Sequence, residues 1–293
     1  MKKPLVSIIT VNYQQSRVTC ELLDTIRALS YPNIETIIVD NAQQQDDTTL
    51  YRSHLPKVKV INSAVNLGFA GANNLGIKAA KGEYMFLLNN DTEIADGTLE
   101  QLLACFDGPR IGAVSPVLRY HSQPEKVQYA GFTEINPMTG RNMIIDEVQK
   151  KRTVDTPYFH GAAVLIPKAV IDQCGLMPED YFLYYEELDW SRIFTKKGFK
   201  LKVCTTACIM HKESVTTGKN SPLKTYYQTR NRVAFMNKHS SPLSKLLFNL
   251  FFHMVSLPTN LFRYGIKGKK EHLIAFLRAF MDASVYKKAG MTF

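Results

Sequence analysis

The feature that most constrains the fold of this 293-residue chain is an alternation of short apolar runs with helical repeats. The runs LVSIITV, IETIIVD, KVKVI, YMFLLNN and IGAVSPVL are typical of strands buried on both faces. Between them, apolar residues from Val18 to Leu29 recur at helical spacing before Pro32, and FAGANNLGIKAAKG and GTLEQLLACF read as further helices. This alternation predicts an α/β fold, a mainly parallel Rossmann-like sheet flanked by helices.

Polar side chains follow three of these predicted strands at the point where each ends. They are Asn12 and Tyr13, then Asp40 and Asn41, then Asn89, Asn90 and Asp91. Each group alone could be the start of a solvated loop. Ligands of open α/β sheets bind beyond the carboxyl ends of the strands, so three such groups together predict a binding crevice.

The sequence restricts how a phosphate ligand could be held in that crevice. The first predicted strand is followed by NYQQS without a glycine, and neither GxGxxG nor GxxxxGK[ST] occurs. A diphosphate bound without a glycine cradle needs another counter-charge, and a divalent cation can supply it. Asp91 offers a hard oxygen ligand, and the amides of Asn89 and Asn90 can orient it or bind water around the metal.

At this point the chain resembles family 2 glycosyltransferases, especially the bacterial rhamnosyltransferase-like branch. The resemblance covers about residues 4 to 240 and is carried by VSIITVNY, IIVDNAQ, NLGFAGANNLGI, FLLNNDTEI, HGAAVLIPKAVIDQCG, YFLYYEELDWSRIFTKKGFKL, MHKES and YYQTRNRVAFMNKH. It implies a GT-A fold and transfer, with inversion, of a sugar from a nucleoside-diphosphate sugar to an acceptor hydroxyl. A thymidine-diphosphate rhamnose donor is the guess that the branch suggests.

The resemblance also implies donor-side roles for individual residues. Asp40 would contact the base or ribose beside Asn12 and Tyr13, and Asn73 stands where many members place an arginine. Asp91 matches the last acid of the metal-binding motif, although both preceding positions are Asn in this chain. His211 would be a metal ligand opposite Asp91 or a plain hydrogen-bonding residue. A mixed nitrogen and oxygen set suits manganese at least as well as magnesium.

The segment YYEELDW supplies candidates for the general base. Glu187 stands at the family's central Asp position and is the first choice, Glu186 is the second, and Asp189 is either an acceptor-side residue or a structural acid. Acids are also common in a first helical turn because of the helix dipole. The resemblance places His160 and Gly161 on the acceptor side. Trp190 could stack on a sugar there or belong to the core.

The chain is expected to divide into a catalytic domain, residues 1–240, and a basic tail of amphipathic helices, residues 241–293. The net charge is +10, and after Ser241 eight Lys and Arg residues face two acids. Such helices suit an anionic membrane surface, or they pack on the catalytic domain or a second subunit. The five cysteines show no CxxC spacing, and the start does not read as a signal peptide, so we expect a cytoplasmic protein, peripheral on the inner face of the membrane.

The expected partners are a nucleoside-diphosphate sugar and a lipid-linked or growing glycan acceptor. Two alternatives remain open: a nucleotide-sugar-binding protein without catalysis, motivated by the Asn residues before Asp91, and a sugar nucleotidyltransferase. The latter normally has a glycine-rich loop after the first strand, which NYQQS lacks. The basic segment is mostly aliphatic and carries no base-stacking motif, which argues against nucleic acid as a partner.

Overall fold

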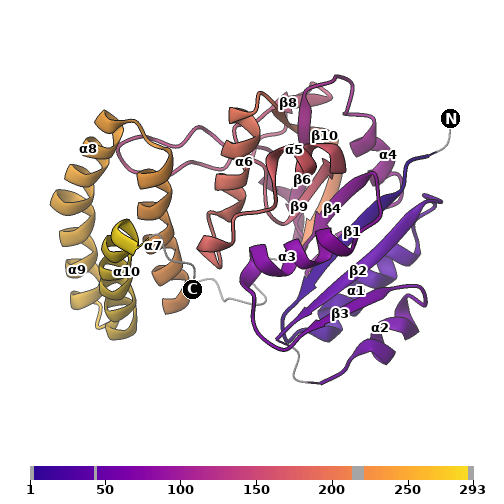
Figure 1. Cartoon of the computed structure of the whole chain (residues 1–293), viewed down its shortest axis with the longest axis horizontal. Coiled ribbons are helices and arrows are strands. Elements are labelled where there is room, and N and C mark those ends of the chain that lie inside the picture. Colours follow the sequence, from indigo (N-terminus) through magenta and orange to yellow (C-terminus); the bar gives the residue numbers. More distant parts are fainter. Residues whose placement is uncertain (1–2, 43–44, 213–220, 290–293) are drawn as a thin grey trace.

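The computed structural model describes residues 3–42, 45–212 and 221–289, so Gln43 of IIVDNAQ and Glu213 and Ser214 of MHKES lie outside the description. Figure 1 shows an α/β body with a group of helices beside it. The strands are β1 (Val6–Asn12), β2 (Ile34–Asn41), β3 (Lys59–Ser63), β4 (Tyr84–Leu88), β5 (Thr92–Ile94), β6 (Ile111–Tyr120), β7 (Gln123–Tyr129), β8 (Thr153–Asp155), β9 (Ala163–Pro167) and β10 (Lys200–His211). The helices of the body are α1 (Ser16–Arg27), α2 (Thr48–His54), α3 (Gly68–Ala79), α4 (Thr98–Leu103), α5 (Lys168–Cys174), the short 3-10 turn η1 (Glu179–Tyr181) and α6 (Glu186–Lys196).

All ten strands belong to one sheet, whose main order is β3-β2-β1-β4-β9-β6-β10-β5. The first four strands of that order run parallel, as the alternation predicts. Beyond β4 the sheet is mixed: β9 lies antiparallel between β4 and β6, and β6 and β10 run parallel to each other. The predicted α/β class is confirmed, and β2, β1 and β4 are neighbours whose carboxyl ends meet at one edge.

The two faces of the sheet are covered by different helices, because successive strand residues point to opposite sides. Ile8 and Phe86 belong to one buried cluster with the apolar face of α1, whereas their neighbours Ile9 and Met85 belong to a second cluster with α3. Helix α3 lies close to the sheet at Gly76, where an added Cβ would be 2.4 Å from a methyl group of Ile9. Glycine at this position therefore lets the helix pack directly on β1 and β2.

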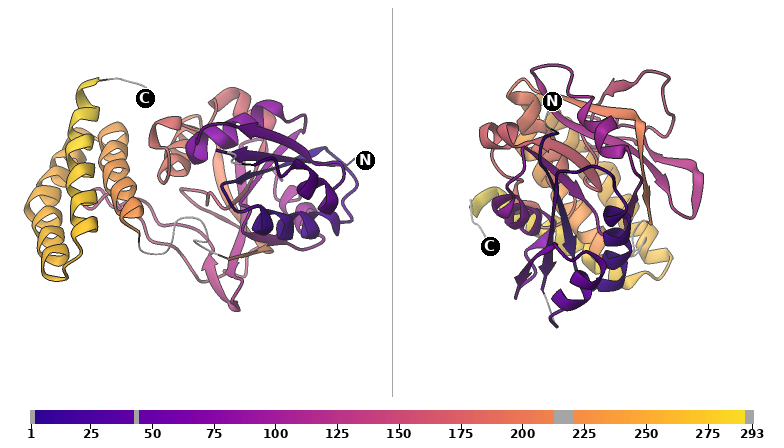
Figure 2. Two further views of the ribbon diagram at one scale, coloured as in Figure 1. Left: turned by 90° about the horizontal axis from the view of Figure 1, so that it is seen from below. Right: turned by 90° about the vertical axis from the view of Figure 1, so that its right-hand side faces the viewer.

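The C-terminal group consists of α7 (Pro222–His239), α8 (Pro242–Phe251), the π-helical turn η2 (Phe252–Ser256), α9 (Leu257–Ile266) and α10 (Lys270–Ala289). The left view of Figure 2 shows these helices together beside the body. Helix α10 packs along α7, and Phe248, Phe252 and Phe276 are buried within the group. The predicted boundary after residue 240 falls between α7 and α8. Pro258 lies in the first turn of α9, directly after η2, where a missing backbone N–H is tolerated.

Helices α8 and α9 keep large apolar side chains in solvent. They include Leu243, Leu246, Leu250, Phe262 and Ile266. Helix α9 has no buried residue at all. In the part of the chain that the structure describes, no helix is both long and apolar enough to cross a lipid bilayer.

Candidate functional site

The ends of β1, β2 and β4 are joined by a buried chain of hydrogen bonds. Asn12 Nδ2 donates to Asp40 Oδ1 at 2.9 Å. Thr19 of α1 donates its hydroxyl to Asn12 Oδ1 at 2.9 Å and accepts from Asn90 Nδ2 at 3.1 Å. The structure thus brings together polar residues that the sequence places at three separate strand ends.

Asp40 accepts two hydrogen bonds in this network, one on each carboxylate oxygen. Its Oδ2 accepts from the hydroxyl of Tyr51 at 3.0 Å. Burial raises the pKa of the Asp40 carboxyl, and the bonds from Asn12 and Tyr51 partly offset this. Each carboxylate oxygen has a further lone pair that a ribose hydroxyl can use. Tyr13, next to Asn12, is partly buried at the same edge.

Two predicted donor-side residues have other roles in the structure. Asn41 is buried, and its amide binds Asn66 Oδ1 at 2.9 Å and the N–H of Leu67 at 2.8 Å, which shapes the turn before α3. Asn73 is buried and donates its amide to the carbonyl of Phe69 in the same helix at 2.9 Å. Both side chains are bonded to neighbouring protein groups, and direct donor contact by Asn41 or Asn73 stays a prediction.

Asp91 and His211 face each other at the predicted metal site. The antiparallel pairing of β5 with β10 places Thr92 opposite His211, which brings Asp91 Oδ1 to 3.2 Å from His211 Nε2. Both side chains are buried. The other ring nitrogen, Nδ1, lies 2.8 Å from Oε1 of Gln128 on β7. The amide oxygen can only accept, so Nδ1 donates to Gln128, and the ring is held with Nε2 on the side that faces Asp91.

This arrangement fits a divalent cation. An imidazole nitrogen and a carboxylate oxygen 3.2 Å apart are a nitrogen and oxygen donor pair that can bind one cation together. Gln128 supplies the second hydrogen bond that orients a metal-binding histidine. Within the described ranges no cluster of three or more His, Cys, Asp or Glu residues could hold a metal, so the protein offers two donors here. Oxygens of a diphosphate and water would complete the coordination of Mn²⁺ or Mg²⁺.

The acids of α6 follow a backbone of unusual shape. Phe182, Tyr184 and Tyr185 have φ of 64°, 69° and 78°, although none is glycine. Such conformations are sparsely populated and persist where the surroundings hold them. The amide of Asn231 in α7 donates to the carbonyls of Tyr181, Leu183 and Tyr184 at 3.0, 2.8 and 2.8 Å. Asn231 therefore holds the segment that places Glu186 and Glu187.

Glu186 and Glu187 have perturbed acidity. Burial raises the pKa of Glu187 to about 7, against a smaller lowering by backbone N–H groups. The pKa of Glu186 is raised above its usual value by burial first and by the charge of Glu187 second. Glu186 is buried and its Oε2 has no hydrogen-bond partner among the described residues, whereas Glu187 is only partly buried. A carboxyl group with a pKa near 7 and access to solvent suits proton transfer at neutral pH.

His160 and Gly161 connect the two halves of the site. The rings of His160 and His211 lie 6.4 Å apart. A Cβ at Gly161 would lie 3.8 Å from Cβ of Glu187, and the next residue, Ala162, accepts the N–H of Asn89 at 2.8 Å. Burial lowers the pKa of His160 to about 3, so this ring is neutral. Asp91, His211 and Glu187 are thus parts of one contiguous site.

For Trp190 and Asp189 the structure favours the second of the two predicted roles, a core residue and a structural acid, over contact with the acceptor. Trp190 is 0% exposed, donates its indole N–H to Gly175 O at 3.0 Å and packs on Phe159 and Phe194, so it is a core residue and cannot stack on a sugar. Asp189 is also 0% exposed and accepts from Lys238 and His239 at 2.6 Å each. These ion pairs join α6 to the end of α7, and they hold the pKa of Asp189 below its usual value despite its burial.

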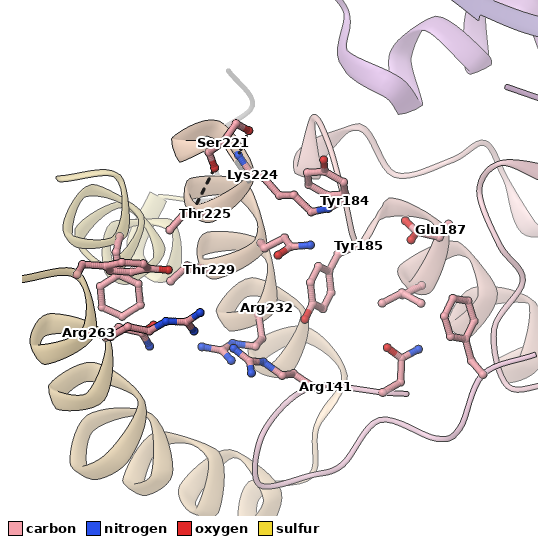
Figure 3. A pocket seen from close by; sticks show the side chains of 17 residues that line it. Arg141, Tyr184, Tyr185, Glu187, Ser221, Lys224, Thr225, Thr229, Arg232 and Arg263 are labelled. Atoms are coloured by element: carbon pink, nitrogen blue, oxygen red, sulfur yellow. Dashed lines mark hydrogen bonds between the residues drawn. The ribbon is translucent and has the colours of Figure 1, made fainter. Parts of the chain in front are cut away.

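A cavity of about 460 Å³ opens on the side of Glu187 that faces the C-terminal helices (Figure 3). Its lining includes Tyr185, Glu187 and side chains of α7, α9 and α10. Neither Asp91 nor His211 lines it. Glu187 therefore lies between the Asp91–His211 pair and this cavity.

Several residues of the site were not identified from the sequence. Gln128 lies on a strand that no motif indicated, and nothing in its neighbourhood predicts contact with His211. Asn231 belongs to the motif YYQTRNRVAFMNKH, but its bonds to the segment 181–184 depend on the packing of α7 against the body. The arginines of the cavity are far apart in the chain.

Comparison with known proteins agrees with this geometry. Residues 7–175 match the family described as Glycosyl transferase family 2. The low-salt glycan biosynthesis hexosyltransferase Agl10 of Haloferax volcanii is 24% identical over 79% of this chain and 75% of its own. The N-acetylglucosaminyl-diphospho-decaprenol L-rhamnosyltransferase of Mycobacterium tuberculosis is 21% identical over 73% and 78%. The dTDP-rhamnosyl transferase RfbF of Shigella flexneri is 23% identical over 86% and 88%.

Solved structures share the fold at lower identity. The mannosyltransferase PcManGT of Pyrobaculum calidifontis, in complex with GDP-Man and Mn²⁺, aligns with a TM-score of 0.61 at 17% identity over 97% of this chain and 76% of that one. TarS of S. aureus, residues 1–349 in complex with UDP-GlcNAc, aligns with a TM-score of 0.62 at 18% identity over 95% and 80%. These likenesses confirm the predicted GT-A fold.

Proposed function

The chain belongs to glycosyl transferase family 2, and from that membership and the geometry above we propose that it is an inverting enzyme with Glu187 as its general base. Membership makes it a glycosyltransferase that acts on nucleotide sugars. The observation that carries the proposal is the contiguity of the Asp91–His211 pair, the segment 160–161 and Glu187.

On the donor side, the hydrogen-bonded chain of Asn12, Asp40 and Asn90 would receive the nucleoside. Asp91 and His211 would hold a divalent cation, Mn²⁺ or Mg²⁺, at the diphosphate. When bound, such a cation neutralises the charge that develops on a departing diphosphate. In this chain the contact of Gln128 with Nδ1 would hold the His211 ring with Nε2 toward Asp91 and the diphosphate.

On the acceptor side, Glu187 would accept the proton of the attacking hydroxyl. The acceptor oxygen forms a bond to the anomeric carbon while the bond from that carbon to the diphosphate oxygen breaks, and the nucleoside diphosphate leaves with the electron pair. Attack and departure on opposite faces of the sugar require one base and invert the configuration. A pKa of about 7 leaves a substantial fraction of Glu187 ionised at neutral pH.

The relatives favour particular substrates. Among the similar proteins, one is named as a dTDP-rhamnosyl transferase and another as an L-rhamnosyltransferase for N-acetylglucosaminyl-diphospho-decaprenol. We therefore propose a dTDP-rhamnose donor and a hydroxyl of a lipid-linked or growing cell-surface glycan as acceptor. The exposed apolar residues of α8 and α9 support a peripheral position on an anionic membrane, at the cytoplasmic face.

A binding protein without catalysis is the second candidate, because Asn89 and Asn90 replace acids of the family's metal motif. The glycosyltransferase and the binding protein are distinguished by measuring release of the nucleoside diphosphate from dTDP-rhamnose, with and without a chelator. If the chain is an enzyme, the chelator should suppress turnover, and Asp91→Ala and Glu187→Gln should each abolish it. Donor binding without transfer across a panel of acceptors would support the binding protein.

A further inference from the structure

The cavity beside Glu187 has an unusual charge. Among the described residues, four cationic side chains line it, and Glu187 supplies the one carboxyl group. The cations are Arg141, Lys224, Arg232 and Arg263. Figure 3 shows the three guanidinium groups gathered near the Tyr185 hydroxyl, with Glu187 on the other side of that ring. A small-molecule site of ordinary size, about 300–1,000 Å³, thus carries a strong positive charge.

Arg232 is the most constrained of these cations. It is only 3% exposed, and its Nε has no hydrogen-bond partner within the described ranges. Its Nη2 donates to the hydroxyl of Ser256 at 3.2 Å, and its guanidinium lies 5.2 Å from the centre of the Phe252 ring. Neither neighbour carries negative charge. A buried guanidinium without a carboxylate is costly unless an anion binds to it.

A second arginine is held against the first. Gly140 has φ of +65°, and a Cβ there would lie 3.1 Å from Cγ of Arg232 and 2.9 Å from Phe248. The carbonyl of Gly140 accepts the Tyr185 hydroxyl at 3.1 Å. This close approach brings Arg141 beside Arg232. Burial first, and the charge of Arg141 second, lower the pKa of Arg232 to about 10. Two like charges kept together in this way define a site for an anion with several oxygens.

The third arginine links the cavity to an apolar surface. Arg263 lies on α9, and it has no ion-pair partner among residues 3–42, 45–212 and 221–289. Phe262 and Ile266, on the same helix, are 71% and 69% exposed. An amphiphile whose anionic group lies among the arginines could therefore continue along the apolar side chains of α9. A free phosphate would leave that surface unused.

We propose that this cavity binds the diphosphate of the lipid-linked acceptor, with Arg141, Arg232 and Arg263 on its oxygens and the lipid along α9. This inference rests on the proposed function, because Glu187 at the cavity wall would receive the proton of the acceptor sugar's hydroxyl. The donor diphosphate is a different group, since Asp91 and His211 do not line the cavity. The acceptor hydroxyl lies on a sugar near the diphosphate, within the reach of Glu187.

Farnesyl diphosphate is a suitable probe, compared with inorganic pyrophosphate and farnesol by calorimetric titration of the full chain. Arg141→Gln and Arg263→Gln change exposed side chains and should fold, whereas Arg232 is buried. Each is expected to weaken farnesyl diphosphate binding roughly tenfold or more, as for a lost charge-assisted hydrogen bond. Arg278→Gln on α10, exposed and outside the cavity, is the matched control and should bind as the unchanged chain does.

Four results would overturn the assignment. The first is unchanged affinity for farnesyl diphosphate in both cavity variants, and the second is pyrophosphate binding as tight as farnesyl diphosphate binding. The third is a parallel loss, in the cavity variants, of binding to phosphatidylglycerol vesicles. The fourth is a parallel loss, in the same variants, of affinity for dTDP with Mn²⁺. The third would assign the cavity to membrane head groups and the fourth to the donor. Binding of farnesyl diphosphate needs no donor or turnover, so it can succeed where the transfer assay of the proposed function fails, and the reverse.

Discussion

Replacing Glu187 by glutamine removes an ionisable group and keeps the size of the side chain. Loss of the base is expected to reduce sugar transfer about 10²- to 10⁴-fold. The same change should stabilise the fold at high pH. Burial raises the pKa of Glu187 to about 7 from an ordinary value of 4.5, so the charged form is unfavourable in the folded chain.

The sign of the effect follows from proton binding. Between pH 4.5 and 7 the folded chain holds a proton on Glu187 that the unfolded chain releases, so stability from this group is complete below pH 4.5 and is lost as the pH rises through about 7. The change in pKa corresponds to at most about 3 kcal/mol, and partial exposure of Glu187 reduces this to about 1–2 kcal/mol. Glu187→Gln also removes a charge that raises the pKa of the buried Glu186, and this likewise stabilises the folded chain at high pH.

The assay is thermal unfolding of both proteins at pH 5 and pH 8, together with transfer rates. Glu187→Gln should unfold a few degrees higher than the unchanged chain at pH 8, and at nearly the same temperature at pH 5. Glu125→Gln on β7, which is exposed, is the control and should show neither effect. An equal difference in melting temperature at both pH values, or transfer retained by Glu187→Gln, would refute the reasoning.

Three further substitutions test other parts of the site. Asp91→Asn or His211→Gln should abolish the Mn²⁺-dependent rise in melting temperature that dTDP produces, and a rise of normal size would count against the metal pair. Asn231→Asp removes the amide that holds the carbonyls of residues 181, 183 and 184. We expect the free energy of unfolding, measured with denaturant, to fall by about 2–3 kcal/mol and kcat to fall as well. An unaltered kcat would show that this segment does not position the base. Trp190→Phe should cost about 1–3 kcal/mol without changing the KM for acceptor, because the indole is in the core. A raised KM would restore the sugar-stacking role.

The alternation of apolar strands and helices was sufficient to predict the fold class, since each pattern depends on local spacing. The strand-end residues Asn12, Asp40 and Asp91 could be placed together because parallel neighbours end at one edge. Burial and partners could not be predicted in this way. Trp190 and Asn73 face the interior because of the register of whole helices, which residue type does not reveal.

The cationic cavity shows the same limit. Arg141 comes from a loop, Arg232 from α7 and Arg263 from α9, and only the packing of the C-terminal helices against the body brings them together. The sequence showed a basic tail with amphipathic helices. It did not show that Nε of Arg232, buried beneath that tail, would lack a hydrogen-bond partner among the described residues.

Anomalous diffraction at the manganese edge, from crystals of the chain grown with Mn²⁺ and a nucleoside diphosphate, locates the donor site. We expect one strong peak in contact with both Asp91 and His211 Nε2, with the diphosphate on the same ion and Glu187 facing the open side. A peak elsewhere, or a nucleoside diphosphate bound away from the ends of β1, β2 and β4, would contradict this expectation.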